Sequence, residues 1–493
     1  MSHVLTYMTF IPLLGMAVIL CLPREQHALI KWTAAIATTP PLLMAIWLFV
    51  NFDRTQAGFQ LMERHTWIAF GSFKAEYLVG VDGISVTMVL LTALLCFICI
   101  FASWGIDKAV KGYFALFLLL DTGMMGVFVA LDFLLFFVFW EVMLLPMYFL
   151  IGIWGGPRRE YAAIKFFLYT LVGSALMLLA ILALYFYNDP HTLDMTQLIA
   201  NNAHYSRQFQ LVVWVALFVG FAIKIPAFPF HTWLPDAHVE APTAISVILA
   251  GVLLKMGTYG LLRVNYAILP LATADLAYYF LGALGTFNIV YGALCAMAQK
   301  DLKKLVAYSS ISHMGYVMLG MASFTLQGIN GAVLQMFNHG TVTAMLFLLV
   351  GVIYDRAHHR DIEGFGGLAS TMPVYTGITA LAFFAAMGLP GLSAFISEVL
   401  VLIGAWQAMP GLTVIAATAV VLTAGYLLWT MQRMYFGKVN EKYAGLPEIN
   451  GRELFTLMPL GAIVVVLGVY PAPVLDLMTR SLQNLNQIVQ PYL

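Results

Sequence analysis

Long apolar runs, separated by short polar segments, recur from one end of the chain to the other. Each run has roughly 20 residues, which is enough for one helix to cross a bilayer. The runs are continuous and do not alternate with polar residues, so they predict helices rather than the strands of a membrane barrel. We therefore expect an all-α polytopic membrane protein with about 14 transmembrane helices, at residues 4–22, 29–50, 84–104, 113–131, 133–154, 162–187, 209–230, 241–264, 272–297, 304–323, 328–354, 373–407, 411–436 and 453–475.

Two of these spans are interrupted by proline and glycine. The seventh, 209–230, contains IKIPAFPF, and the twelfth, 373–407, contains MGLPGLSAF. Five spans separate the two breaks, and an odd number of crossings inverts the second copy of a repeat relative to the first. Discontinuous helices at corresponding positions are typical of inverted-repeat transporters. We therefore expect two inverted five-helix repeats with discontinuous helices in spans 7 and 12.

This organisation divides the chain into four parts. They are the first three helices, the first repeat (spans 4–8), the second repeat (spans 9–13), and the last helix with a C-terminal tail, at residues 1–110, 111–266, 267–440 and 441–493. Loop lysines and arginines concentrate on one side when the N-terminus is placed outside, and such residues favour the cytoplasmic side. Both termini are therefore predicted on the periplasmic side.

Composition excludes a soluble multidomain enzyme, because 61% of the residues are hydrophobic and only 10% are charged. Soluble domains have about 25% charged residues. The net charge is zero, which argues against a nucleic-acid partner. The first apolar run has no basic segment before it and no small-residue cleavage site, so we interpret it as a span rather than a removable signal.

Ionisable residues inside the predicted spans are the candidate functional residues. Each costs about 2.5–3.5 kcal/mol on insertion scales, and such residues usually mark ion or proton pathways. Lys255 lies about 20 Å along its span, too deep for its ammonium to reach the near surface. A single buried charge could belong to a structural ion pair, whereas lysines, carboxylates and histidines together are the groups of a proton relay. The complete set is Asp121, Glu141, Lys165, Lys224, Lys255, His313, His339 and Glu398.

Other motifs carry weaker signals. Cys96 and Cys99 form a CxxC, which could be a redox or metal pair, but no second CxxC or nearby histidine accompanies it, so we interpret the pair as packing residues. His231 and His238 have poor zinc spacing, and we interpret them as structural or proton-exit groups. EGFGG at 363–367 lacks the strand and the lysine of a phosphate loop. No nucleotide, flavin, haem or iron–sulfur signature is present, so we expect no cofactor in this chain.

Several long strings occur in the order found in one family. They are FVFWEVMLLPMYFLIGIWGG (137–156), KIPAFPFHTWLPDAHVEAPTAISVILAGVLLKMGTYGLLR (224–263), AQKDLKKLVAYSSISHMGYV (298–317), QMFNHG (335–340) and GLPGLSAFISE (388–398). In these strings the chain resembles the antiporter-type membrane subunits of respiratory complex I. Subunits L and N of that group, and the D subunit of multisubunit cation/proton antiporters, usually have lysine where this chain has Glu398. The resemblance is therefore to the branch with glutamate.

The resemblance implies a role for seven of these eight residues. Glu141 and Lys224 would form the carboxylate–lysine pair of spans five and seven, and Lys165 would tune it. Lys255 would be the central lysine of span eight, followed along the polar axis by the remaining three groups, His313, His339 and Glu398. Asp121 stands where family members vary and receives no role.

The resemblance also implies a function. The chain would translocate protons in a bacterial plasma (inner) membrane, as a translocase subunit of NADH:quinone oxidoreductase. NADH, FMN, iron–sulfur clusters and quinone would be bound by other subunits. Its partners would be the bilayer, the neighbouring subunits L and N, and the rest of the membrane arm. A subunit of an Mrp-type Na⁺/H⁺ antiporter, a subunit of an energy-converting membrane hydrogenase, and a structural scaffold are the alternatives.

Overall fold

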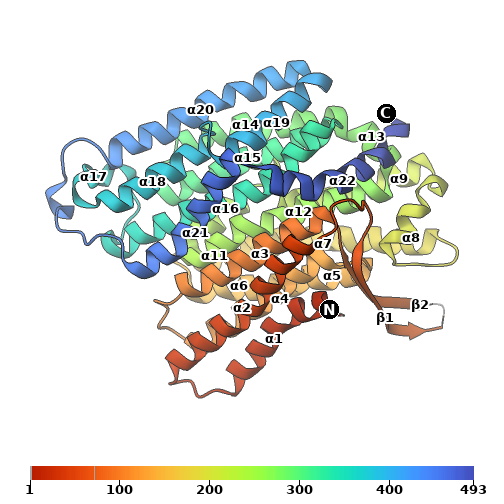
Figure 1. Cartoon of the computed structure of the whole chain (residues 1–493), viewed down its shortest axis with the longest axis horizontal. Coiled ribbons are helices and arrows are strands. Elements are labelled where there is room, and N and C mark those ends of the chain that lie inside the picture. The colour runs from red at the N-terminus through yellow and green to blue at the C-terminus, as the bar shows by residue number, and fades with distance from the viewer. Residues whose placement is uncertain (1–2, 72) are drawn as a thin grey trace.

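The computed structural model describes residues 3–71 and 73–493, and long helices make up most of them (Figure 1). Most of the long helices are inclined in the same direction, so they form one packed bundle. The helices that cover the predicted spans before the first repeat's break are α1 (Val4–Cys21), α2 (His27–Asn51), α3 (Gly83–Ala102), α4 (Val110–Val129), α5 (Phe133–Val142), α6 (Leu144–Trp154), α7 (Arg159–Tyr187) and α9 (Arg207–Lys224). After the break come α10 (Trp233–Glu240), α11 (Thr243–Ile248), α12 (Leu254–Gly260), α13 (Pro270–Leu276), α14 (Gly282–Met297), α15 (Leu302–Ala322), α16 (Leu326–Ala357), α18 (Pro373–Ala386), α19 (Ser393–Ala408), α20 (Pro410–Met434) and α21 (Gly451–Val469).

Twelve helical segments among the described residues are long and apolar enough to cross a membrane. The other two predicted spans, 304–323 and 373–407, fall on helices of a different kind. α15 has 21 residues, but its two lysines, three serines and one histidine make it less apolar. α18 and α19 have 14 and 16 residues, so each is shorter than a full span. The polytopic helical fold is confirmed, while the count of about 14 spans and the inverted repeats stay predictions.

Both predicted breaks are present. α9 ends at Lys224, and residues 225–232, which include Pro226 and Pro229, separate it from α10. At the other break, residues 387–392 separate α18 from α19, and Gly388 and Gly391 there have φ of 74° and 94°. Proline removes a backbone donor and glycine tolerates positive φ, so both segments interrupt the helical hydrogen-bond ladder.

Two further irregularities lie beside predicted site residues. The span at 133–154 is divided at Met143, two residues after Glu141 and shortly before Pro146. The helix that carries Lys255 contains two π-helical segments, η2 (Leu249–Leu253) and η3 (Leu261–Tyr266), one on each side of α12. Such π-helical turns occur frequently at functional sites.

Two elements differ from the predicted all-α chain. Residues 60–70 and 73–81, expected as loop, form the two strands of an antiparallel hairpin, β1 (Gln60–Phe70) and β2 (Phe73–Val81), which projects from the bundle in Figure 1. The expected C-terminal tail folds into α22 (Ala472–Val489), whose apolar side packs on α3 and α16. At this contact the Gly83 N–H donates to Ser481 Oγ at 3.0 Å.

Candidate functional site

Lys224 lies at the last residue of α9, where the helix opens, and its side chain is buried. Its ammonium is surrounded by polarisable groups rather than by oxygen atoms. Nζ lies 3.7 Å from Met143 Sδ, 5.4 Å from the centre of the Trp140 ring and 5.3 Å from that of Phe166. Among the described residues, Lys224 is thus a buried cation that contacts a sulfur atom and two aromatic rings but no carboxylate.

Glu141 approaches this lysine without touching it. The carboxylate is close enough for its charge to act on Lys224, yet no oxygen of Glu141 lies within 4.0 Å of Nζ. Among residues 3–71 and 73–493, the buried Glu141 Oε1 has no hydrogen-bond partner. The structure thus brings the predicted pair together but leaves a gap between the two charges.

Lys165, predicted to tune the Glu141–Lys224 pair, forms an ion pair with a residue outside that pair. Its Nζ lies 2.8 Å from Asp236 Oδ2 on α10, and Arg158 approaches the other oxygen of Asp236 at 3.5 Å. Lys165 therefore ties α7 to the short helix that follows the break. Asp236 was not among the predicted site residues, although it stands in the same HTWLPDAH string as the break.

Four other predicted residues, Lys255, His313, His339 and Glu398, form two direct contacts. The first contact joins Lys255 to His339. Lys255 is fully buried, and its Nζ donates to Ala250 O within the π-helical turn and lies 2.6 Å from His339 Nδ1. An ammonium has only donors, so His339 Nδ1 is assigned as the acceptor and its proton as residing on Nε2. His339 Nε2 is buried and has no partner in the described part of the chain.

His313 and Glu398 form the second direct contact. His313 Nδ1 lies 2.9 Å from Glu398 Oε1, so the ring is assigned as donor at Nδ1 and acceptor at Nε2. Gln335 Nε2 donates to the same oxygen at 3.1 Å, and Ser397 Oγ donates to Gln335 Oε1 at 2.5 Å. This network fixes the position of the carboxylate without a lysine or arginine partner.

The two contacts meet at a small cavity. The ring centres of His313 and His339 lie 5.7 Å apart, and both rings line a cavity of about 10 Å³. Among the described residues, the unpaired ring nitrogen of each histidine is Nε2, a donor on His339 and an acceptor on His313. Lys255, His339, His313 and Glu398 are therefore placed in one row with matching donors and acceptors, which we call the lysine–histidine–glutamate row.

Three other predicted or considered groups lie outside this row. Asp121 is buried in α4 beside Cys96, which does not belong to a disulfide. His231 Nε2 lies 3.0 Å from Tyr291 Oη. His238 is fully buried in α10, stacks on Phe347 at 4.5 Å, and has no partner for either ring nitrogen among the described residues. No group of three or more histidine, cysteine, aspartate or glutamate side chains in ranges 3–71 and 73–493 could hold a metal ion.

A family model described as "NADH:quinone oxidoreductase/Mrp antiporter, TM" matches residues 130–423, which is more than half of the chain. The chain belongs to this family. The matched range contains the seven residues to which the resemblance gives a role, from Glu141 to Glu398, whereas Asp121 lies before it. The resemblance of the quoted strings to antiporter-type membrane subunits is thereby confirmed.

Relatives from bacteria and plants are similar over nearly the whole chain. NADH-quinone oxidoreductase subunit M of Rhodobacter capsulatus is 43% identical, and the alignment covers 99% of this chain and 97% of that protein. NADH-ubiquinone oxidoreductase chain 4 of Arabidopsis thaliana is 42% identical over 97% of this chain and 95% of that protein. Neither relative is named as subunit L or N, the subunits that usually have lysine where this chain has Glu398. The two names therefore agree with the branch that Glu398 favours.

Solved structures have the same fold. A chain of respiratory complex I from Thermus thermophilus with bound NADH matches with a TM-score of 0.87 and 29% identity, covering 98% of this chain and 99% of that one. A chain of the Mrp complex from Dietzia sp. DQ12-45-1b matches with a TM-score of 0.86 over 100% and 99% of the two chains. Its identity is 20%, so this second likeness shows the fold alone.

Proposed function

We propose that this chain is the proton-translocating membrane subunit of an NADH:quinone oxidoreductase, corresponding to subunit M of bacteria and chain 4 of mitochondria. NADH oxidation and quinone reduction, with FMN and iron–sulfur clusters, belong to other subunits of the complex. The observation that carries this proposal is the lysine–histidine–glutamate row, which is buried and ends at Glu398 on α19, the helix that begins after the second break. The lysine, histidine and glutamate side chains of the row can all bind and release protons. The relatives of the chain are named as subunits of this oxidoreductase.

The row moves a proton by passing it from one side of each imidazole to the other. Lys255 gives a proton to His339 Nδ1, and His339 releases its Nε2 proton across the small cavity to His313 Nε2. The resulting imidazolium of His313 gives its Nδ1 proton to Glu398. Each ring gains one proton and loses one, so the net result is one proton moved from Lys255 to Glu398. Histidine suits this task because both of its forms are populated near neutral pH.

The Glu141–Lys224 pair is the proposed point where energy enters. Two unit charges about 4 Å apart interact by about 4 kcal/mol at an effective dielectric of 20. Moving one charge against 100 mV costs about 2.3 kcal/mol, so closing and opening this pair is large enough to gate one proton. The gap between the charges and the opening of α9 at Lys224 support a pair that changes its distance. Lys165 acts on this pair through Asp236 and α10 rather than by contact.

The same proposal implies a membrane, neighbouring subunits and an orientation for this chain. The chain lies in the bacterial plasma membrane among the other membrane-arm subunits, with subunits L and N as neighbours and both termini on the periplasmic side. An Mrp-type antiporter subunit has the same fold. The identities of 42–43% to subunit M and chain 4 over nearly the whole chain favour the oxidoreductase over that alternative and over a membrane hydrogenase.

Replacement of Lys224 or Glu141 by alanine tests the proposal. We expect either variant complex, reconstituted in vesicles, to lose most of its NADH-driven proton uptake, because the gating pair is gone. NADH oxidation with a soluble artificial acceptor should be nearly unchanged, since that reaction does not involve this chain. Full proton uptake in both variants would contradict the proposal and would favour a structural scaffold.

A further inference from the structure

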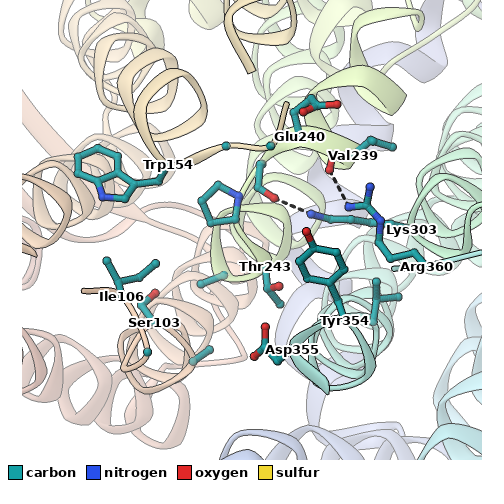
Figure 2. A pocket seen from close by; sticks show the side chains of 18 of the residues that line it. Ser103, Ile106, Trp154, Val239, Glu240, Thr243, Lys303, Tyr354, Asp355 and Arg360 are labelled. Carbon is teal, nitrogen blue, oxygen red and sulfur yellow. Dashed lines mark hydrogen bonds between the residues drawn. The ribbon is translucent and has the colours of Figure 1, made fainter. Parts of the chain in front are cut away.

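A cavity of about 440 Å³ opens at the joint between α10 and α11, beside the first turn of α15. Figure 2 shows its lining side chains, which come from the ends of several helices: Ser103 and Ile106 after α3, Trp154 of α6, Glu240 and Thr243 on either side of the α10–α11 joint, Lys303 of α15, and Asp355 of α16. The loops at this end carry the arginines and lysines that predict the inner side of the membrane. The cavity is large enough to hold a group of several waters.

Lys303 is the buried cation of this cavity. Its side chain is only 4% exposed, and its Nζ donates to Ala241 O at 2.5 Å, as the dashed line in Figure 2 marks. No carboxylate of the described residues lies within 4.0 Å of it, in contrast to the neighbouring Arg360, which is 3.1 Å from Asp301. Two of the three ammonium donors of Lys303 are thus left for the cavity.

His238 lies directly behind the cavity wall. It precedes Val239, Glu240 and Ala241, which line the cavity, and Lys303 holds the last of these. Its ring is fully buried with both nitrogens unpartnered among the described residues. The charges of Lys303 and of Lys255 both act on this ring. The histidine is therefore within electrostatic reach of both a cation of the cavity and the first residue of the lysine–histidine–glutamate row.

We propose that this cavity is the aqueous entrance on the inner side and that Lys303 is its first proton carrier. The Lys303 ammonium gives a proton to His238, the imidazolium gives one to the neutral Lys255 amine, and water in the cavity restores the proton of Lys303. An ammonium buried without a carboxylate releases its proton more readily than one in water. This inference rests on the proposed function, because it supplies the protons that the row moves.

If Lys303 had only a structural role, its replacement by arginine would have a different effect from the one that a proton carrier predicts. Lys303 and Arg360 donate to Ala241 O and Val239 O, and cations at the last carbonyls stabilise a helix such as α10. If Lys303 were only such a tether, arginine would replace it, because arginine also donates and stays charged. Arginine cannot lose its proton in a protein, so it cannot replace a carrier.

The test uses the intact complex in vesicles with Lys303 changed to arginine, methionine or histidine. We expect arginine and methionine each to lower NADH-driven proton uptake about tenfold, the factor that corresponds to about 1.4 kcal/mol in a barrier. Histidine should restore part of the uptake, with a pH optimum shifted downward, since its ordinary pKa lies about 4 units below that of lysine. Wild-type uptake in the arginine variant would overturn the proposal.

Two controls keep the result unambiguous. Lys304 is the next residue and does not line the cavity, so its change to methionine removes the same charge and should leave uptake unchanged. Loss of uptake in the Lys224 variant with normal uptake in the Lys303→Arg variant would contradict this inference alone. Normal uptake in both would contradict the proposed function as well.

Access to the cavity is measured separately. In a chain with Cys21 and Cys295 changed to serine, a cysteine at Thr243 should react with a membrane-impermeant thiol reagent added on the inner side only. The native Cys96 and Cys99 are buried and should stay unlabelled. Labelling only from the outer side, or no labelling of the folded complex, would overturn the assignment of the cavity as an inner entrance.

Discussion

Some buried charged side chains in this protein contact a side chain of opposite charge, and others contact an imidazole. The kind of partner decides whether the side chain can pass on a proton. Arg263 is held 2.7 Å from Asp82, with Tyr259 and Ser85 completing its hydrogen bonds. An arginine keeps its proton, so this pair fixes α3 to the π-helical end of the Lys255 helix. The lysine and the carboxylate of the lysine–histidine–glutamate row each contact an imidazole instead, and an imidazole can both accept and release a proton. The Arg263–Asp82 pair therefore suits a structural role, whereas the contacts of the row fit the proton transfer that we propose.

Glu398 is the residue at which this distinction is tested most directly. Glutamine at position 398 has the same shape and can still bond to His313 and Gln335, but it cannot take up a proton. We expect Glu398→Gln to assemble normally and to lower NADH-driven proton uptake by about 10²-fold, the lower end of the range for losing a general acid or base. Assembly is measured by the yield of purified complex, and proton uptake by a pH dye in vesicles.

A matched control is Glu160→Gln, which removes an exposed carboxylate at the start of α7 and should not change uptake. Wild-type uptake in the Glu398 variant would mean that the proton leaves the row before Glu398.

At the scale of elements, the contact of α14 with α15 positions His313. Gly285 and Gly315 face each other so closely that a Cβ on Gly315 would lie 2.6 Å from Gly285 O and 2.8 Å from Ile289 N. Small residues let membrane helices approach in this way. Because backbone atoms of α14 stand in the way, α15 can accept a larger residue only by moving, and His313, two residues earlier, would move with it.

We therefore expect Gly315→Ala to destabilise the subunit by about 1–3 kcal/mol, the usual cost of overpacking. The measurement is the midpoint of thermal unfolding of the purified complex, followed through this subunit. Gly377→Ala on α18 is the control, because a Cβ there would meet nothing within 4 Å. Equal midpoints for both variants would contradict the close contact.

The elements differ in how far the sequence predicts them. Both breaks are foreseen because Pro226, Pro229, Gly388 and Gly391 act locally on the backbone. The hairpin and α22 are missed because neither has a long apolar run, the only signal that membrane spans require. Contacts are missed for another reason: Lys165 and Asp236 are 71 residues apart, and no local pattern pairs them. Residue types therefore predict the row, whereas the partners of Lys165 and Lys224 need the fold.

At the scale of the whole molecule, one cluster joins three segments that are distant in sequence. Arg64 of β1 contacts Glu76 of β2 at 2.9 Å and Asp194, next to α8 (Met195–Ala200), at 2.5 Å. Asp132, which caps α5, accepts a hydrogen bond from the Glu76 N–H at 3.0 Å. This cluster fastens the hairpin to the beginning of the helix that ends beside Glu141. Motion of the hairpin and motion of α5 are therefore linked.

The cluster makes hairpin stability depend on pH through Asp132. Burial raises the pKa of this carboxyl from 3.8 to about 6, against the opposing effect of three backbone N–H bonds. The folded state thus binds the proton more tightly than the unfolded state, so the free energy of unfolding falls as pH rises from about 4 to about 6 and is constant above. We expect amide exchange of β2 to quicken over this range by more in wild type than in Asp132→Asn, after correction for intrinsic exchange. Because the amide side chain of that variant has no proton to lose, identical pH profiles for the two proteins would contradict the assignment.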